Sequence, residues 1–361
     1  MDRQKVGVPI VSTTNGPRRV TIDDVARLTG VSRQTVSRAI NDKPQIDSAT
    51  KQRILTAAKE LGYRPSRFAR GMVRQSTTTL GLVIADVLNP FFPEVVAGVL
   101  EAADARGWHV VIYTTASELS KEREVAETVV DHVDACVAFM LDSAAITRVA
   151  GSGMPFVLLG NEDRPTQLST VRIDFDSGIR QAFDHLVAKG HRNIAMIDDR
   201  DRAKSGAPDI RSGLFTAVAA EYGLRIEPHW RQPSSNSIQG GAAAMERLLE
   251  TAPEVTAVVS YNDMIAIGAM RHARARGLAV PGDRAFVGFD GLALGELVDP
   301  PLTTLHIDKR RLGQAAVEQA AAQMPGGGGM ADTLIRTQLW WGLDVSRHPS
   351  PAPAPFAAAV G

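Results

Sequence analysis

The sequence is poor in the features that membrane, secreted and disulfide-bonded proteins share. No window in its 361 residues approaches the roughly 18 consecutive apolar residues of a membrane span, so no membrane partner is expected. The first 17 residues are polar and lack the apolar core of a secretory signal, which predicts a cytoplasmic protein. The single cysteine, Cys136, excludes an internal disulfide framework and a cysteine-based zinc site.

Catalytic signatures are missing as well. The sequence contains no Gly-x-Ser-x-Gly, no His-Glu-x-x-His, no Walker A loop and no dinucleotide fingerprint, and its eight histidines are scattered. We therefore expect a protein that is not an enzyme and that holds neither a cofactor nor a metal. Fold alone leaves an enzyme open, because doubly wound folds support many reactions.

The net charge of zero conceals an uneven distribution. Residues 1–74 contain 15 Lys and Arg against 6 Asp and Glu, a net charge of +9, and the remaining residues carry −9. A basic head on an acidic body indicates that the head meets a polyanion and the body does not. Charge alone also permits a solvated basic tail.

Three short helices are predicted in the head. Thr21 and Asp24 have the spacing of a capping box at the start of the first helix. Ser32 can cap a second helix that runs to about Ile40, and a third begins near Ser48. Two short helices joined by a tight glycine-containing turn form a helix-turn-helix, whose second helix enters the major groove of DNA.

The second helix has a polar side suited to reading bases. Gln can bond adenine at two atoms, Arg can bond guanine, and Thr can contact a thymine methyl group. An ordinary capped helix pair is the alternative that the pattern leaves open. The polar side consists of Arg33, Gln34, Thr35, Ser37 and Arg38.

After residue 79 the chain alternates short apolar runs with amphipathic stretches. Such runs, rich in Val, Ile and Phe, are typical of parallel strands that are covered on both faces. Repeated strand–helix units predict doubly wound parallel sheets, and the length predicts two sheets with a cleft between them. The runs are 80–85, 109–113, 136–140, 156–159, 194–197, 257–260 and 286–289.

Several strings carry a resemblance to a known family. The head reads Val20-Thr-Ile-Asp-Asp-Val-Ala and then Gly30-Val-Ser-Arg-Gln-Thr-Val-Ser-Arg-Ala-Ile-Asn41. Further strings follow in the body: Asn89-Pro-Phe-Phe92, Lys189-Gly-His191, Tyr261-Asn-Asp263, Val287-Gly-Phe-Asp290 and Pro301-Leu-Thr-Thr304. Over about residues 20–345 the chain resembles the lactose-repressor/galactose-repressor (LacI/GalR) family of transcriptional regulators.

The resemblance implies a function and an assembly. It implies a sequence-specific DNA-binding regulator, with repression the favoured mode, whose operator affinity is modulated by a small-molecule effector bound between two lobes. The effector is expected to be a sugar or a sugar derivative; a sugar acid and a nucleoside stay open. A pseudo-palindromic double-stranded operator requires a homodimer. Segments near 95–100 and 292–298 are expected in its interface.

The resemblance also implies a division into domains. The fold class is a small all-α helix-turn-helix head plus an α/β body of two doubly wound parallel sheets, similar to type I periplasmic binding proteins. The parts are a disordered leader at 1–18, a helix-turn-helix DNA-binding domain at 19–64, a hinge helix or linker at 65–78, an effector-binding domain at 79–345 and a disordered tail at 346–361. The N-lobe is expected at about 79–177 and 304–330, and the C-lobe at about 178–303 and 331–345.

DNA contacts are implied position by position. Thr21, Ser32, Thr35 and Asn41 fall on phosphate-contacting or helix-positioning places, and Arg33, Gln34 and Arg38 on base-reading places. Met72 stands where the family inserts a leucine into the minor groove, and methionine is among the side chains that act as such a wedge. The implied set is Thr21, Ser32, Arg33, Gln34, Thr35, Ser37, Arg38, Asn41, Tyr63, Arg67, Ala69 and Met72.

Effector contacts are implied at the carboxyl ends of strands, outside which open α/β sheets bind their ligands. Amides and carboxylates share hydroxyl protons, an arginine gives directed donors, and rings cover apolar faces, which together suit a polyol. The alternatives are a solvated arginine at 211, a turn aspartate at 290, and only one of two adjacent phenylalanines in the cleft. The implied set is Phe91, Phe92, Asn161, Arg211, Asn262 and Asp290.

Two other interpretations use only part of the chain. The body alone would permit a periplasmic binding protein, and the head alone a nonspecific, nucleoid-type DNA-binding protein. The absent secretory signal and the attached head argue against the first. A DNA footprint that shows no sequence preference and is insensitive to every small molecule would support the second.

Overall fold

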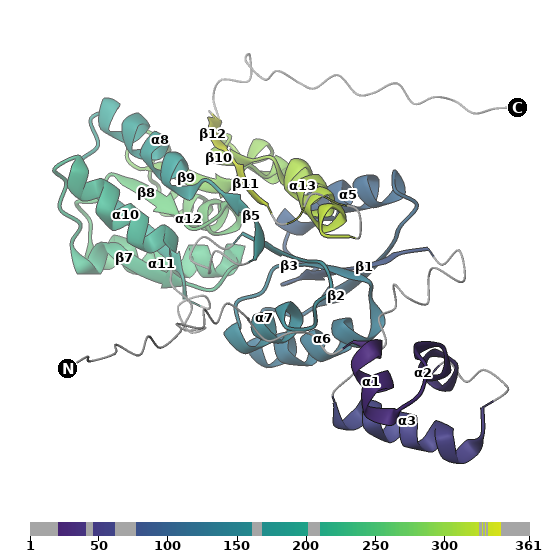
Figure 1. Cartoon of the computed structure of the whole chain (residues 1–361). Helices are drawn as coiled ribbons and strands as arrows, with labels where there is room; N and C mark the ends of the chain where they lie inside the picture. The colour runs from purple at the N-terminus through teal and green to yellow at the C-terminus, as the bar shows by residue number, and fades with distance from the viewer. Residues whose placement is uncertain are drawn as a thin grey trace, which may run out of the picture. The chain divides into compact units, whose positions relative to one another are not determined.

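The computed structural model describes residues 21–40, 46–61, 77–160, 168–200, 210–324, 327, 329 and 331–340. The predicted leader, the tail and nearly all of the predicted hinge segment lie outside these residues. The chain forms two compact units, residues 1–77 and 78–361 (Figure 1). In the described residues, no helix combines the length and apolar character that crossing a membrane requires.

The first unit holds three helices, α1 (Ile22–Thr29), α2 (Arg33–Ile40) and α3 (Ser48–Glu60). The predicted caps are present: the carboxylate of Asp24 accepts from the amide and hydroxyl of Thr21, at 2.8 and 2.7 Å, and the hydroxyl of Ser32 accepts from the amide of Thr35 at 3.1 Å. Gly30 adopts a left-handed φ of 68°, which lets the chain turn sharply between α1 and α2. The three helices share a small apolar core of Val25, Val36, Ala39, Ile54 and Ala58.

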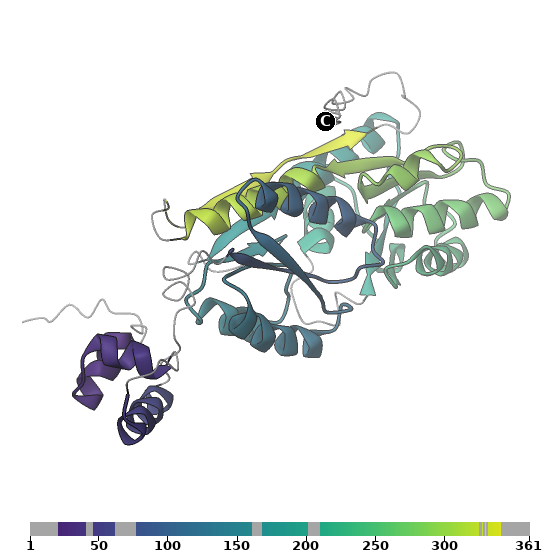
Figure 2. The ribbon, with the colours of Figure 1, turned by 90° about the vertical axis from the view of Figure 1, so that its right-hand side faces the viewer.

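The second unit contains two lobes, of which the N-lobe is a six-stranded sheet in the order β11-β5-β4-β3-β1-β2, with every neighbouring pair parallel. Two helices cover one face, α5 (Phe91–Asp104) and α13 (Lys309–Ala322), and two cover the other, α6 (Leu119–His132) and α7 (Ser143–Ala150) (Figures 1 and 2). The strands are β1 (Thr79–Ile84), β2 (His109–Thr114), β3 (Ala135–Ala138), β4 (Phe156–Leu159), β5 (Ser169–Ile173) and β11 (Asp332–Ile335).

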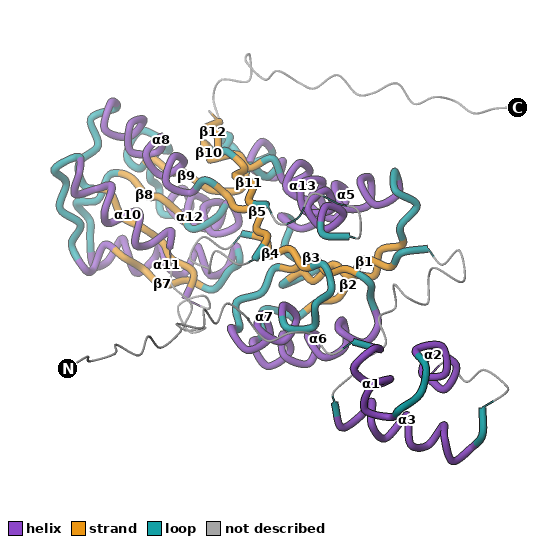
Figure 3. Tube along the Cα trace, viewed as in Figure 1, coloured by secondary structure: helices purple, strands orange, loops and turns teal. Residues whose placement is uncertain are grey.

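The C-lobe repeats this architecture around a sheet in the order β12-β10-β9-β8-β6-β7, parallel except that β12 pairs antiparallel with β10. Strands and helices alternate along its trace as they do in the N-lobe (Figure 3). Its strands are β6 (Ile194–Asp199), β7 (Arg231–Ser234), β8 (Ala257–Ser260), β9 (Ala285–Asp290), β10 (Thr303–Ile307) and β12 (Thr337–Trp340). Its helices are α8 (Phe175–Ala188), α10 (Ile210–Glu221), α11 (Ile238–Thr251) and α12 (Asp263–Ala275), with short 3-10 turns at Pro228–Trp230 and Ala293–Glu296. The predicted fold class is therefore confirmed.

The chain crosses between the lobes three times. It passes from β5 to α8, returns from β10 to α13, and crosses again from β11 to β12. These crossings correct the predicted lobe boundaries at two strands. Strand β10 was expected in the N-lobe but pairs with β9 of the C-lobe, and β11 was expected in the C-lobe but pairs with β5 of the N-lobe. Short apolar strands look alike in any sheet, so the sequence pattern does not reveal which neighbour each one joins.

Strand β2 corrects a second expectation. Residues 109–113 were predicted to be covered on both faces, but β2 lies at the edge of its sheet, where Val111 and Ile112 are 41% and 44% exposed. An edge strand has a neighbour on one side only, which leaves it accessible to another surface.

Close packing of α5 against α13 yields a test of the N-lobe. A Cβ added at Gly98 of α5 would lie 2.0 Å from the carbonyl oxygen of Arg310. We expect Gly98→Ala to lower the free energy of unfolding by about 1–3 kcal/mol in urea titrations, because two packed helices would have to separate. Gly213→Ala in α10 is the matched control: its added Cβ meets nothing within 4 Å, so it should be neutral or stabilising by up to about 1 kcal/mol. Equal stability of the two variants would contradict the packing described here.

Candidate effector pocket and DNA-binding helix

In the head, α2 turns its apolar residues inward and its polar residues outward. Val36 and Ala39 are buried, whereas Arg33, Gln34 and Arg38 are exposed. The remaining predicted contacts on or beside this helix are also described: Thr21, Thr35 and Ser37 are half-buried and Ser32 is exposed. Asn41, Tyr63, Arg67, Ala69 and Met72 lie outside the described residues. The described DNA-contact candidates thus include three long, exposed side chains on one helix.

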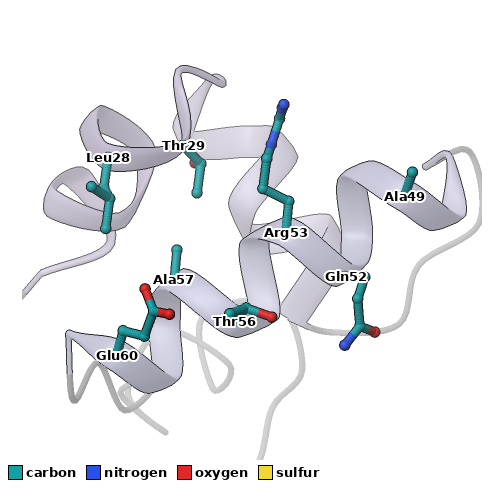
Figure 4. Close-up of a pocket in the computed structure, with 8 residues that line it drawn as sticks. All are labelled: Leu28, Thr29, Ala49, Gln52, Arg53, Thr56, Ala57 and Glu60. Atoms are coloured by element: carbon teal, nitrogen blue, oxygen red, sulfur yellow. The ribbon is translucent and has the colours of Figure 1, made fainter.

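A shallow groove of about 660 Å³ lies elsewhere on the head, where the end of α1 meets one side of α3 (Figure 4). Leu28 and Thr29 of α1 line it together with residues of α3, among them Arg53 and Glu60, which bring one charge of each sign. None of the predicted DNA-contact residues lines this groove. It is therefore separate from the proposed recognition surface of α2.

In the body, a cavity of about 570 Å³ is lined by residues from both lobes. Most of these residues follow the carboxyl ends of parallel strands, where the topology predicts a ligand. Five of the six predicted effector-binding residues meet there, and Asn161 lies outside the described residues. The five are Phe91, Phe92, Arg211, Asn262 and Asp290.

Three phenylalanines form an apolar wall on the N-lobe side. Phe91, Phe92 and Phe139 contact one another edge to face, with ring centroids 5.1 to 6.0 Å apart. Phe91 and Phe92 are both largely buried and both line the cavity. The alternative in which only one of them reaches the cleft is therefore wrong.

Arg211 of α10 is held among aromatic rings on the C-lobe side. Its Nη1 donates a hydrogen bond to the carbonyl oxygen of Tyr261 at 2.5 Å. Its guanidinium carbon lies 4.2 to 4.8 Å from three ring centroids, those of Phe175, Tyr261 and Phe289. Such contacts stabilise a cation by about 2 kcal/mol or more where water is excluded. The alternative of a solvated surface arginine is therefore wrong.

A chain of amide hydrogen bonds runs beside Arg211. Asn236 donates to the carboxylate of Asp199 at 3.3 Å, and Asn262 donates to the side-chain oxygen of Asn236 at 2.6 Å. The oxygen of Asn262 in turn accepts from the amide of Ile265 and caps α12. Each amide is thereby oriented, as recognition of a hydroxyl-rich ligand requires. Sequence reasoning missed Asp199 and Asn236, although Asp199 stands at the carboxyl end of β6, which is a recognisable signal.

Two buried carboxyl groups interact beside the cavity, and one of them lines it. Asp290 lines the cavity and is 3% exposed, and Asp263 behind it is fully buried. Asp263 accepts from the amide of Leu292 and the hydroxyl of Thr304, at 2.6 and 2.5 Å. Burial, and then repulsion from Asp290, raise the pKa of Asp263 to about 8. Burial also raises the pKa of Asp290, to about 6, although nearby cations oppose the shift.

Metal binding finds no support in the described ranges. Across them, no three His, Cys, Asp or Glu side chains gather closely enough to hold an ion. Cys136 is buried, and its burial raises the pKa of its thiol to about 12, far from that of a reactive thiolate.

Comparisons with known proteins agree with both units. A model for bacterial regulatory proteins of the lacI family matches residues 21–66, and one for a periplasmic binding protein-like domain matches residues 183–341. The transcriptional regulator CelR of Thermobifida fusca is 34% identical over 82% of this chain and 89% of its own length. The transcriptional repressor CytR of Escherichia coli K12 is 28% identical over 85% and 90%.

Solved structures show the same likeness. A CelR–cellobiose complex superposes with a TM-score of 0.68 at 30% identity, covering 90% of this chain and 99% of that one. A lac repressor dimer bound to operator superposes with a TM-score of 0.67 at 25% identity, covering 90% and 98%. The chain therefore belongs to the lacI family of bacterial regulatory proteins: it is a non-enzymatic, DNA-binding transcriptional regulator with a periplasmic-binding-protein-like effector domain.

Proposed function

We propose that this regulator reads its operator with the exposed side of α2 and responds to a neutral sugar held between the lobes of its body, with repression the favoured mode. The proposal of a sugar rests on one observation: aromatic rings line one side of the cavity and polar side chains line the other. A sugar ring has apolar faces and a rim of hydroxyl groups, and the two sides of the cavity match these.

Charge favours an uncharged effector over an anion. The described lining includes one guanidinium, that of Arg211, and four carboxyl groups, those of Asp86, Glu122, Asp199 and Asp290. An anionic sugar acid or phosphate would meet more repulsion than attraction there. The relatives support a disaccharide: one similar structure is a complex of CelR with cellobiose, and another, from Arthrobacter, is a complex with lactose.

We propose a homodimer acting in the cytoplasm on a pseudo-palindromic operator. The lac repressor relative binds its operator as a dimer. In the segments expected at the interface, Leu100, Leu294 and Leu297 are 46%, 39% and 81% exposed, and the edge of β2 adds further apolar surface. Exposed large apolar side chains of this kind are typical of surfaces that pair.

We propose that the hinge segment 65–78 and the residues Asn41, Tyr63, Arg67, Ala69 and Met72 complete the DNA contacts. This part rests on the resemblance and on the basic charge of the head. Effector binding would close the cleft and change operator affinity, by no more than the effector's differential affinity for the two states.

The DNA-binding proposal is tested by Arg38→Ala. Operators are first selected from random duplexes with the wild-type protein, and affinities are then measured by fluorescence anisotropy at one salt concentration. We expect the variant to bind the selected operator about 10- to 100-fold more weakly, with a lower ratio of operator to scrambled affinity, because a base contact is lost. Arg27→Ala, an equal charge loss on α1 at a 71% exposed side chain, should leave that ratio unchanged. An unchanged ratio in Arg38→Ala would show that this arginine reads no base.

The effector proposal is tested by thermal shift with cellobiose, lactose, ribose and the anion gluconate. At a hundredfold excess over Kd, a bound sugar stabilises the protein by about 2.7 kcal/mol and raises Tm by several degrees. We expect the shift with a neutral disaccharide and a smaller shift in Asp290→Asn. The full shift should remain in Asp104→Asn, which removes an exposed carboxylate distant in sequence from the lining. A shift with gluconate alone, or with none of the four, would contradict the proposed neutral disaccharide.

A further inference from the structure

Lys309 is the most unusual charged residue of the body. It begins α13 and is fully buried, which is rare for lysine. Its ammonium donates to three backbone carbonyl oxygens, those of Asp290 at 2.7 Å, Gly291 at 3.1 Å and Ile307 at 3.3 Å. It also lies 3.3 Å from the carboxylate of Glu94 on α5. The buried ammonium of Lys309 thus forms hydrogen bonds with the backbone at the end of strand β9.

These bonds cross the boundary between the lobes. Lys309 and Glu94 belong to helices that cover the N-lobe sheet, whereas Asp290 and Gly291 end β9 in the C-lobe sheet. Asp290 is also the carboxylate that lines the effector cavity. Lys309 therefore connects an N-lobe helix to the backbone of a cavity residue in the other lobe.

The backbone that Lys309 holds is strained. Asp290 has a φ of 117°, which residues with a Cβ rarely adopt, and Gly291 follows with a φ of 66°. A Cβ at Gly291 would lie 2.5 Å from the ring of His306, so the turn is also tightly enclosed. Strained backbone persists only where its surroundings hold it. Hydrogen bonds to the carbonyls of both residues supply such a hold.

Charged groups face Asp290 from several elements. Asp263 reaches it from α12, Arg211 from α10 and Lys309 from α13, while Glu94 lies beyond Lys309 and His306 beside the turn. The charge of Lys309 lowers the pKa of Asp290 and of Asp263, opposing the effect of burial. It therefore favours the ionised carboxylate at the cavity.

We propose that Lys309 is a positioning residue for the effector: from across the lobe boundary it holds the Asp290–Gly291 turn so that the carboxylate of Asp290 faces the cavity. The proposal rests on the proposed effector role of that cavity. It adds that the N-lobe helix α13, through one ammonium group, controls a contact made by the C-lobe.

The first test needs no effector and uses Lys309→Met in the full chain, with Tm measured from pH 5 to pH 9. Both carboxyl groups have raised folded-state pKa values, so their contribution to stability is present at low pH and is lost as pH rises through about 6 and about 8. Removing the cation raises both pKa values further. The Tm deficit of Lys309→Met should therefore grow steadily with pH, and Lys309→Arg, which keeps the charge, should restore the wild-type slope.

If Lys309 only filled space, Lys309→Met would lower Tm equally at every pH. A constant Tm deficit would therefore overturn the proposal. Lys121→Met is the matched control, since the side chain of Lys121 is 45% exposed and pairs with Glu118, three residues before it. Its pH profile should follow the wild type. If Lys309→Met does not fold, Lys309→Gln replaces it, because the amide donates hydrogen bonds without charge and predicts the same growing deficit.

The second test measures cellobiose binding by calorimetry at pH 7.5. Lys309→Met should weaken cellobiose binding at least about tenfold, the effect of disturbing a buried bond to a charged group. The double variant Lys309→Met/Asp290→Asn should bind no more weakly than Asp290→Asn alone, because both act through one group. Additive losses would overturn the positioning role. If the wild type binds neither cellobiose nor lactose, the proposed disaccharide fails, while the pH profile still decides whether Lys309 acts on the acidic pair.

Discussion

The structure of the body depends on one constraint: the chain passes three times between the sheets of its two lobes. Hydrogen bonds join two of these crossings, since the amide of Asp174 donates to Ile335 and the hydroxyl of Thr337 donates to the carbonyl of Asp174. The remaining crossing, from β10 to α13, leads directly to Lys309. Because the crossings hold the carboxyl ends of both sheets toward one cavity, loops from both lobes become its walls.

The two sides of the cavity differ in chemistry: the N-lobe side is lined by aromatic rings and the C-lobe side by polar groups. The phenylalanines of the N-lobe wall exclude water at no polar cost. On the C-lobe side, buried polar groups are tolerated because each has bonding partners: Arg211 has three rings and a carbonyl, and Asp263 has an amide and a hydroxyl. Polar groups oriented before a ligand arrives lose little entropy on binding, which favours a specific response to one effector.

Sequence reasoning succeeded where a signal is local. The caps of α1 and α2, the strand–helix alternation and the end of β9 at Asp290 all depend on neighbours in the chain. It failed where partners are distant. Strands β10 and β11 were assigned to the wrong lobes because an apolar strand does not encode its neighbour. The cage around Arg211 was not foreseen either, because Phe175, Tyr261 and Phe289 come from three separate segments.

Lys309 illustrates the same limit most clearly. It stands in the run Asp308-Lys-Arg-Arg311, which has the composition of a solvated helix start. Arg310 and Arg311 do lie at the surface, where they pair with Glu101 and Glu318. Only the helical turn of α13 and the approach of β9 direct the first of the three cations inward. Whether a cation of this run is solvated or buried against the Asp290–Gly291 turn thus depends on how the two lobes pack together.

That meeting also constrains how an effector can act. A ligand biases a two-state protein only through contacts that differ between the states. Contacts within one lobe stay the same when lobes move as rigid bodies, so they do not favour one lobe arrangement over the other. The bonds from Lys309 to the Asp290–Gly291 turn join the two lobes and also support a carboxylate of the cavity. They are therefore among the contacts that lobe movement must either preserve or break, and an effector that favours one arrangement of Asp290 would favour the lobe arrangement in which Lys309 holds it.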